Sequence, residues 1–251
     1  MSIRLITIDS EINSAKKLDF PCSTYLRGYV EDYDSDIIVR WGRSCLWPKK
    51  PSKPLEYKNG EFKKVLNHYQ SIIDNCNKKL SLQRLSTIVK TPKIYEKLVP
   101  KRVKCVYRPN NHSGGKGFKI VSGGVKVQEG YYATQFIKTN LEYRVFFCGN
   151  KTMTVTRVKP KNKNISLVCR SLWGYNRFRK TPARLHKMAL KAAKVLKLDM
   201  GAFDILVKNG NYYFLEANTA VTCDNKKIRD FYNKNILKLC KLKKFNNLKF
   251  S

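Results

Sequence analysis

The sequence predicts a mixed α/β protein, in which a small α/β unit precedes a longer part built from antiparallel strands and two helices. Three patterns support this prediction. Two strand-like runs and a helical pattern come first, short strands alternate with polar turns over 103–158, and a helix then precedes a hairpin with an Asn-Gly turn. Hairpins rather than βαβ repeats are therefore expected after the first unit. The length of 251 residues allows one or two domains.

The N-terminal unit is predicted from residues 3–8 and 37–41, which are apolar and rich in β-branched side chains, as strands are. Apolar residues then recur at helical spacing, which predicts a helix over about 61–76. Its apolar face consists of Phe62, Val65, Leu66, Tyr69, Ile72 and Ile73. We expect this α/β unit to end near residue 90.

Short strands are predicted for the middle of the chain, because apolar runs there are separated by Gly, Pro and Asn. They are expected at 103–109, 118–121 and 125–137, with a polar glycine-rich loop at 110–117. The segment 141–158 is predicted to be a further hairpin that turns at Gly149-Asn150.

A basic loop is expected at 159–180, followed by a helix with Thr181 as N-cap and Pro182 in its first turn. Residues 203–217 are predicted to form a hairpin around Asn209-Gly210, since Asn-Gly between strands is a strong hairpin signal. The tail 226–250 is predicted to be a basic amphipathic helix. The apolar face of the first helix is Leu185, Met188, Ala189, Ala192, Ala193 and Leu196, and that of the tail is Ile228, Phe231, Tyr232 and Ile236.

The composition excludes several classes of protein. Hydrophobic residues make up 42% of the chain, which excludes intrinsic disorder. No run approaches the about 18 apolar residues that a membrane span needs, and the N-terminus lacks a signal-peptide cleavage site. We therefore expect a cytoplasmic protein without a membrane partner. The eight cysteines contain no CxxC pair, so we expect free thiols, with a nucleophilic Cys or a Cys/His metal site as less favoured alternatives.

The net charge of +33 is unevenly distributed. Residues 143–198 contain 15 Lys or Arg and no acid, and 97–128 contain eight and no acid. Solvated surface or codon bias would explain many lysines, but codon bias would also supply Asp and Glu, of which there are only 18. A polyanionic partner is therefore predicted: nucleic acid, an acidic protein segment or a phosphate-rich ligand.

Two features point to chemistry. Strand alternation and the Asn-Gly turn place Asp204, Glu216 and Asn218 on one face of a hairpin, where their oxygen atoms suit Mg²⁺. The alternative is that Asp204 and Glu216 are separately solvated at strand ends. In the loop 110–117, glycines would let backbone N–H groups approach phosphate oxygens. This loop lacks the GxxxxGK[ST] spacing of a Walker A motif.

The order of these motifs resembles the ATP-grasp superfamily of carboxylate–amine ligases over about residues 75–225, and is most similar to the branch of the ribosomal-protein glutamate ligases. The family's last motif is matched by Gly201-Ala-Phe-Asp204-Ile-Leu and Leu215-Glu216-Ala-Asn218. This resemblance implies that Asp204, Glu216 and Asn218 bind the metal.

Further positions match by the same resemblance. The nucleotide would be bound by Lys79 (or its neighbour Lys78), Arg108, the flap residues Ser113, Gly114, Gly115, Lys116 and Gly117, the hinge Gln135, Phe136 and Ile137, and Glu142 and Arg144, with Glu142 a candidate for the ribose hydroxyls. Arg157, Lys159 and Arg170 would face the acyl phosphate.

The resemblance implies an ATP-grasp fold, in which two α+β subdomains clasp ATP behind a small α/β pre-domain. The domains would be 1–90, 91–140 with the flap, and 141–251 with the metal site and basic tail. ATP and Mg²⁺ (or Mn²⁺) are the implied cofactors, and an acyl phosphate attacked by an amine is the implied chemistry. Two departures concern the acceptor loop after Asn218, which lacks Pro and Gly, and Ala202, where some relatives have Arg.

Two other functions stay open. A nucleic-acid-binding protein on the same scaffold would use Arg177 and Arg179 with the aromatic Trp173, Tyr175 and Phe178. A kinase would stop at the phosphorylated product. For the ligase, the charge favours an acidic peptide or protein, or a nucleic-acid-linked group, as one of the two substrates.

Overall fold

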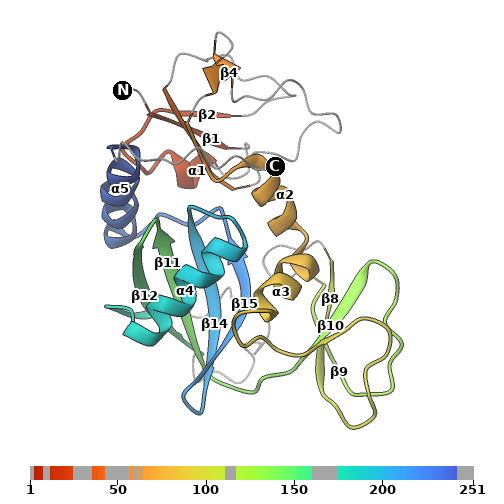
Figure 1. Ribbon diagram of the computed structural model, residues 1–251. Helices are drawn as coiled ribbons and strands as arrows, with labels where there is room; N and C mark the ends of the chain where they lie inside the picture. Colours follow the sequence, from red (N-terminus) through yellow and green to blue (C-terminus); the bar gives the residue numbers. More distant parts are fainter. Residues whose placement is uncertain are drawn as a thin grey trace.

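The computed structural model describes residues 3–7, 12–24, 36–42, 57–58, 61–62, 64–110, 117–159 and 174–241. These residues form a four-stranded sheet near the N-terminus, a second four-stranded sheet, a five-stranded sheet and a two-stranded ribbon. Figure 1 shows the first sheet above the other two, which lie side by side below it. The mixed α/β class is confirmed.

The N-terminal sheet is parallel. Its order is β2 (Cys22–Thr24), β1 (Ile3–Thr7), β3 (Ile37–Arg40) and β6 (Lys64–Leu66). Helix α1 (Ile12–Ala15) follows β1. The ribbon pairs β4 (Tyr57–Lys58) with β5 (Glu61–Phe62). The strands expected at 3–8 and 37–41 are thereby confirmed.

The predicted helix over 61–76 is wrong in its first half. Residues 61–62 and 64–66 lie in strands, and only α2 (Tyr69–Cys76) is helical, followed by α3 (Lys78–Ser86). Asn67 has a left-handed φ of 58°, and its backbone N–H donates to Asp199 Oδ2 while Nδ2 donates to Met200 O. These bonds turn the chain out of the sheet, and His68 then caps α2. Apolar spacing alone does not separate a β-strand followed by a helix from one longer helix.

The second sheet is antiparallel and has the order β7 (Ile94–Tyr95), β10 (Tyr131–Gln135), β8 (Cys105–Pro109), β9 (Lys119–Val121). Strands at 103–109 and 118–121 are confirmed, with shorter bounds. The strand expected over 125–137 is only β10, and before it lies a bridge between Leu98 and Lys126. One face packs Cys105 and Tyr107 into a small core, so Arg108 and its β10 partner Tyr132 occupy the other face.

The third sheet is also antiparallel, with the order β13 (Gly174–Arg179), β12 (Lys151–Val158), β11 (Leu141–Cys148), β14 (Met200–Lys208), β15 (Asn211–Asn218). Both predicted hairpins are confirmed. Asn209 and Gly210 have φ of 49° and 71°, as an Asn-Gly turn with two positive φ angles requires. The expected loop 159–180 is wrong at 174–179, where β13 pairs with β12.

Helix α4 (Ala183–Val195) covers one face of the third sheet (Figure 1). Its predicted apolar face packs on Phe203, Ile205 and Phe214. The N-cap prediction is off by one residue, because Pro182 is the cap and Thr181 Oγ1 instead accepts from Thr154 Oγ1 at 2.8 Å.

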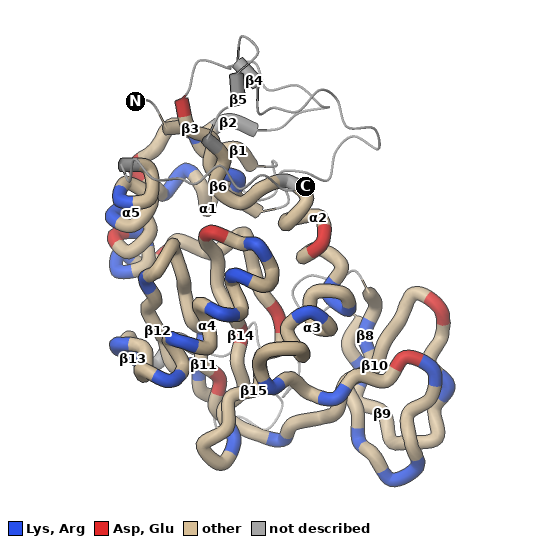
Figure 2. Tube along the Cα trace, in the orientation of Figure 1, with Lys and Arg blue, Asp and Glu red and all other residues tan. Residues whose placement is uncertain are grey.

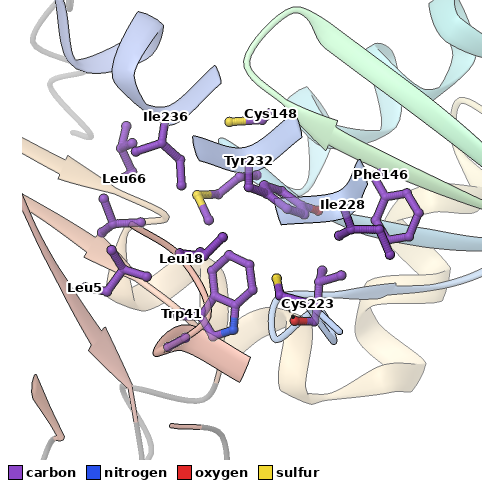
Figure 3. Close-up of a cluster of buried hydrophobic side chains, with 14 of the residues drawn as sticks. Leu5, Leu18, Trp41, Leu66, Phe146, Cys148, Cys223, Ile228, Tyr232 and Ile236 are labelled. Atoms are coloured by element: carbon purple, nitrogen blue, oxygen red, sulfur yellow. Dashed lines mark hydrogen bonds between the residues drawn. The ribbon is translucent and has the colours of Figure 1, made fainter. Parts of the chain in front are cut away.

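Helix α5 (Lys226–Lys241) confirms the tail prediction as far as 241, and 242–251 lie outside the described residues. Its apolar side chains join the N-terminal sheet to the third sheet in one core (Figure 3). Tyr232 meets Trp41 edge-on at 5.4 Å between ring centroids, and its hydroxyl donates to Gly201 O at 2.7 Å. None of the described helices is long and apolar enough to cross a membrane.

The described cysteines are free, and Cys105, Cys148, Cys223 and Cys240 are buried. Burial raises the pKa of Cys105 to about 11 and that of Cys223 to about 12. Such thiols stay protonated and pack as apolar groups. Cys45 and Cys169 lie outside the described residues.

Candidate active site

The candidate site occupies the face of the third sheet that points away from α4. Phe203 and Ile205 pack against α4, so alternation along β14 turns Asp204 to the opposite face. The same alternation places Glu142 and Arg144 of β11 and Arg157 of β12 on that face. Polar and charged side chains from four neighbouring strands therefore converge there.

Asp204, Glu216 and Asn218 lie together, as the hairpin pattern predicts. Asp204 is directly opposite Glu216, and Asn218 Nδ2 donates to Asp204 Oδ2 at 3.2 Å. A β-bulge after Asp204 pairs Ile205 with Phe214, which leaves one extra residue in β15. The bulge lets both Phe214 and Ala217 face α4 while Glu216 and Asn218 face the site.

Gly201 is required by the close approach of β14 and β15 at this point. Its φ is 153°, and a Cβ there would lie 2.7 Å from Asn218 O. Any side chain would push apart the strand that carries Asn218 and the strand that carries Asp204. The glycine in the sequence motif thus has a structural role.

Two ion pairs tie cations to carboxylates on this face. Arg144 donates from Nε to Asp204 Oδ1 at 2.6 Å and from NH2 to Asp204 Oδ2 at 2.7 Å. Arg157 NH1 donates to Glu142 Oε1 at 2.6 Å, and Glu142 is only 1% exposed. The predicted contact of Glu142 with a ribose stays a prediction, since its carboxylate is buried against Arg157.

The second sheet presents its polar face to the same site. Arg108 is buried, donates from NH2 to Thr134 Oγ1 at 2.9 Å, and lies over the rings of Phe118 and Tyr132. Burial raises the pKa of Tyr132, while the positive charge of Arg108 lowers it and the negative charge of Glu216 raises it. Glu216 of the third sheet is therefore close enough to Tyr132 of the second sheet for its charge to act there. Tyr132 and Thr134 were not predicted, although their alternation with Ala133 was visible in the sequence.

The two lysines at the start of α3 have different surroundings. Lys78 Nζ donates to Ala217 O at 2.8 Å, between Glu216 and Asn218 in β15. Lys79 Nζ donates to Glu96 at 3.2 Å in an exposed pair. Asn77 caps α3 through a bond from Leu80 N to its Oδ1, and this cap sets which lysine points to the sheet. The structure brings Lys78, rather than the predicted Lys79, against the strand that carries Glu216 and Asn218.

The predicted hinge links the second and third sheets. The N–H groups of Gln135 and Phe136 donate to Lys93 O and Lys104 O, and Ile137 packs on Leu206 and Leu215. A base bound at this segment would therefore have to use its other backbone groups.

The remaining predicted residues belong to the flap and to the basic loop. Gly117, the last residue of the flap, has a left-handed φ of 76°, and Lys159 N donates to Asn140 O. Ser113, Gly114, Gly115, Lys116, Arg170 and Trp173 lie outside the described residues, as does the side chain of Tyr175.

The donor set suits a hard divalent ion. Asp204, Glu216 and Asn218 together offer carboxylate and amide oxygens, the ligands that Mg²⁺ prefers. Among the described residues, no group of three or more His, Cys, Asp or Glu could hold a metal ion, so the amide of Asn218 is needed as the third ligand here. The buried Nε of Arg108 has no hydrogen-bond partner among the described residues, as expected of a donor that awaits an anion.

No protein-family model and no curated protein matches the chain. Solved structures do match it. D-cycloserine synthetase DcsG has a TM-score of 0.64 at 10% identity, covering 96% of this chain and 100% of that one. D-alanine–D-alanine ligase from Bacillus anthracis has a TM-score of 0.60 at 15% identity, covering 95% and 98%. The ATP-grasp ligase PsnB, solved with a minimal precursor, Mg and ADP, has a TM-score of 0.60 at 13% identity, covering 94% and 96%.

These likenesses extend over nearly the whole chain and are to ATP-grasp ligases. At such identities they establish the fold, and the chain has the ATP-grasp fold. The resemblance inferred from the motifs is thus confirmed at the level of the fold, whereas the ribosomal-protein glutamate ligase branch stays a prediction.

Proposed function

We propose that this protein is an ATP-dependent ligase that activates a carboxylate as an acyl phosphate and joins it to an amine. One observation carries the proposal: a single face of the third sheet gathers Asp204, Glu216 and Asn218, and Lys78 bonds to Ala217 O in the strand that carries Glu216 and Asn218. Oxygen ligands for a divalent ion next to cations for phosphate are what phosphoryl transfer needs.

Each residue has a place in the proposed chemistry. Asp204, Glu216 and Asn218 would hold Mg²⁺, which neutralises charge on the phosphates and polarises the transferred group. Lys78 and Arg108 would bind phosphate oxygens, with the flap Ser113–Gly117 above them and the base at 135–137. Arg157, with Lys159 and Arg170, would stabilise the oxyanion that develops when the amine attacks. A flap that excludes water would protect the acyl phosphate from hydrolysis.

The charge balance of the site supports this proposal. The described residues proposed for it include three carboxylates (Glu142, Asp204 and Glu216) and five cations (Lys78, Arg108, Arg144, Arg157 and Lys159). A surplus of two positive charges does not neutralise a triphosphate, so a divalent ion would supply what the side chains lack. ATP with Mg²⁺, or Mn²⁺ of the same preference, is therefore the proposed cofactor set.

For the substrate we propose an acidic peptide or protein. Lys and Arg clearly outnumber Asp and Glu along the described chain (Figure 2), and the whole sequence has 51 of the former and 18 of the latter. Such an excess of positive charge attracts polyanions. Two of the similar structures, PsnB and the macrocyclase MdnC from Microcystis aeruginosa, are bound to precursor peptides, which makes a peptide substrate the first to test.

The test measures release of ADP and phosphate with Mg²⁺, using pooled amino acids and acidic peptides as acceptors. Mass spectrometry of the same reactions should show a peptide whose mass has increased by one condensed unit. Glu216→Ala should abolish ADP release without unfolding the protein. Phosphate retained on the product would instead indicate a kinase.

A nucleic-acid-binding function is the second candidate, and the acid-free stretch 143–198 favours it. In the structure its α4 part covers the face of the third sheet opposite the carboxylates, so binding there would not need the site. Affinity for nucleic acid would then fall steeply with salt and stay intact in Glu216→Ala. Nucleic-acid binding gives no reason for Asp204, Glu216 and Asn218 to lie together as metal ligands, whereas a ligase requires them. The ligase is therefore the preferred function.

A further inference from the structure

The Arg144–Asp204 pair occupies the carboxylate that the proposed function gives to the metal. Both oxygens of Asp204 accept hydrogen bonds from the guanidinium, and Asn218 Nδ2 adds a third. A divalent ion needs lone pairs of the same oxygens, and its charge would repel the guanidinium beside it. Arg144 and the metal are therefore competitors for one ligand.

The pairing is imposed by the fold. Arg144 and Asp204 are direct partners in the register of β11 and β14, two neighbouring inner strands of the third sheet, and both side chains are on the face that carries the site. A one-residue slip of either strand would turn its charged side chain into the apolar core under α4, so the register is strongly specified. A guanidinium and a carboxylate held this way meet in the bidentate geometry that fits both groups best.

Burial explains why the site needs a cation at all times. Asp204 is 6% exposed, and a carboxylate that is nearly buried is costly without a partner of opposite charge. In the absence of metal, Arg144 supplies that charge. When the metal supplies it, Arg144 is no longer needed there, and phosphate oxygens of a nucleotide offer the guanidinium an alternative partner.

We propose that Arg144 is the internal counter-ion of the metal site, which holds Asp204 in the empty enzyme and releases it when metal and nucleotide bind together. The proposal rests on the metal site of the proposed function and adds its regulation. It follows that metal and nucleotide binding are coupled: each should strengthen the other, because each removes one reason for the Arg144–Asp204 pair to persist.

The test measures Mn²⁺ binding to the full chain without nucleotide, from the loss of the free-ion signal in electron paramagnetic resonance. Wild type should bind Mn²⁺ weakly. Arg144→Gln should bind it at least about tenfold more tightly, within the usual range of coupling between sites. The gain in affinity for a non-hydrolysable ATP analogue on adding Mn²⁺, followed by equilibrium dialysis, should be smaller in the variant than in wild type.

Arg157→Gln is the matched control, because it breaks the other buried pair of the same face without touching Asp204. Both variants should melt at lower temperature than wild type. Added Mn²⁺ should restore much of the loss in Arg144→Gln and little of it in Arg157→Gln. Arg144→Lys keeps the charge without the bidentate geometry, so its Mn²⁺ affinity should lie between those of wild type and Arg144→Gln. It replaces Arg144→Gln if that variant does not fold.

The outcomes separate this proposal from the proposed function. If wild type binds Mn²⁺ with nucleotide and Glu216→Gln does not, the metal site stands. Unchanged Mn²⁺ affinity in both Arg144 variants would then overturn the counter-ion role alone. If wild type binds no Mn²⁺ even with nucleotide, the metal site itself is wrong and both proposals fall.

Discussion

Exchanging the two lysines at the start of α3 for methionine tests the site most directly, because the residues are neighbours in sequence and differ in surroundings. Lys78 bonds to Ala217 O in the strand that carries Glu216 and Asn218, whereas Lys79 pairs with Glu96 on the surface. Methionine keeps an unbranched stem and removes only the charge. We expect Lys78→Met to weaken nucleotide binding strongly and Lys79→Met to leave it nearly unchanged.

The magnitudes follow from the two environments. A hydrogen bond that involves a charged group contributes about 1.5–3 kcal/mol, so losing a Lys78–phosphate contact should weaken binding about 10- to 150-fold. The Lys79–Glu96 pair has side chains 27% and 48% exposed. Such exposed pairs contribute about 0–1 kcal/mol, and to stability rather than to binding, so the loss should stay below about fivefold.

Calorimetric titration of a non-hydrolysable ATP analogue with Mg²⁺ measures both affinities. Urea unfolding monitors stability in parallel, since Lys78→Met also loses the bond to Ala217 O, at a cost of about 1.5–3 kcal/mol. The reasoning is refuted if Lys79→Met loses as much affinity as Lys78→Met. A Lys78→Met protein that binds like wild type would equally refute it.

Three further predictions concern stability and the thiols. Tyr232→Phe removes the buried bond to Gly201 O and should lower the free energy of unfolding by about 1–2 kcal/mol, measured in urea with an unchanged m-value. Burial raises the pKa of Asp199, so its charge costs stability at neutral pH. Asp199→Asn should therefore be more stable at pH 7, with an advantage that disappears as the pH falls through the raised pKa towards the ordinary value. Iodoacetamide at pH 7.5 should leave Cys105 and Cys223 unlabelled in peptide mapping of the native protein, and early labelling of either would contradict the packing described.

The parts of the fold predicted correctly are those in which local signals are strong. The Asn209-Gly210 turn has few alternatives once two alternating strands flank it, and it fixes the register that brings Asp204 opposite Glu216. The helix α4 has a complete apolar stripe, because one of its faces lies on a sheet. For these elements, local sequence and tertiary packing favour the same structure.

The failures arise where tertiary contacts decide. Val65 and Leu66 fit a helical stripe, yet they belong to β6 because β3 offers parallel partners. The break at Asn67 depends on Asp199, which is 132 residues away in sequence. Similarly, no local pattern distinguishes Lys78 from Lys79 before the position of β15 is known. Contacts between distant residues are invisible to periodicity.

The pairing of Arg144 with Asp204 is another contact between residues far apart in the sequence that local patterns did not predict. Both residues were predicted as parts of the site, one for the nucleotide and one for the metal, because motifs assign roles position by position. Only the register of β11 and β14 shows that the two residues pair with each other, so each has to leave this pair to take the role that its motif assigns. An antiparallel sheet has this property generally, since residues that face one ligand also face their cross-strand partners.

One face of the third sheet packs against α4 in the core, and the other face carries the candidate site. The position of the site on that second face follows from what covers the rest of it. The α4 face is apolar along β11, β14 and β15. The other face is apolar at Phe146 and Ala202, where α5 and the N-terminal sheet cover it, and charged at Arg144 and Asp204, two residues further along the same strands. Because side chains alternate along a strand, residues two positions apart lie on the same face of the sheet but contact different neighbouring elements. The charged site therefore begins where the core contributed by the N-terminal unit ends.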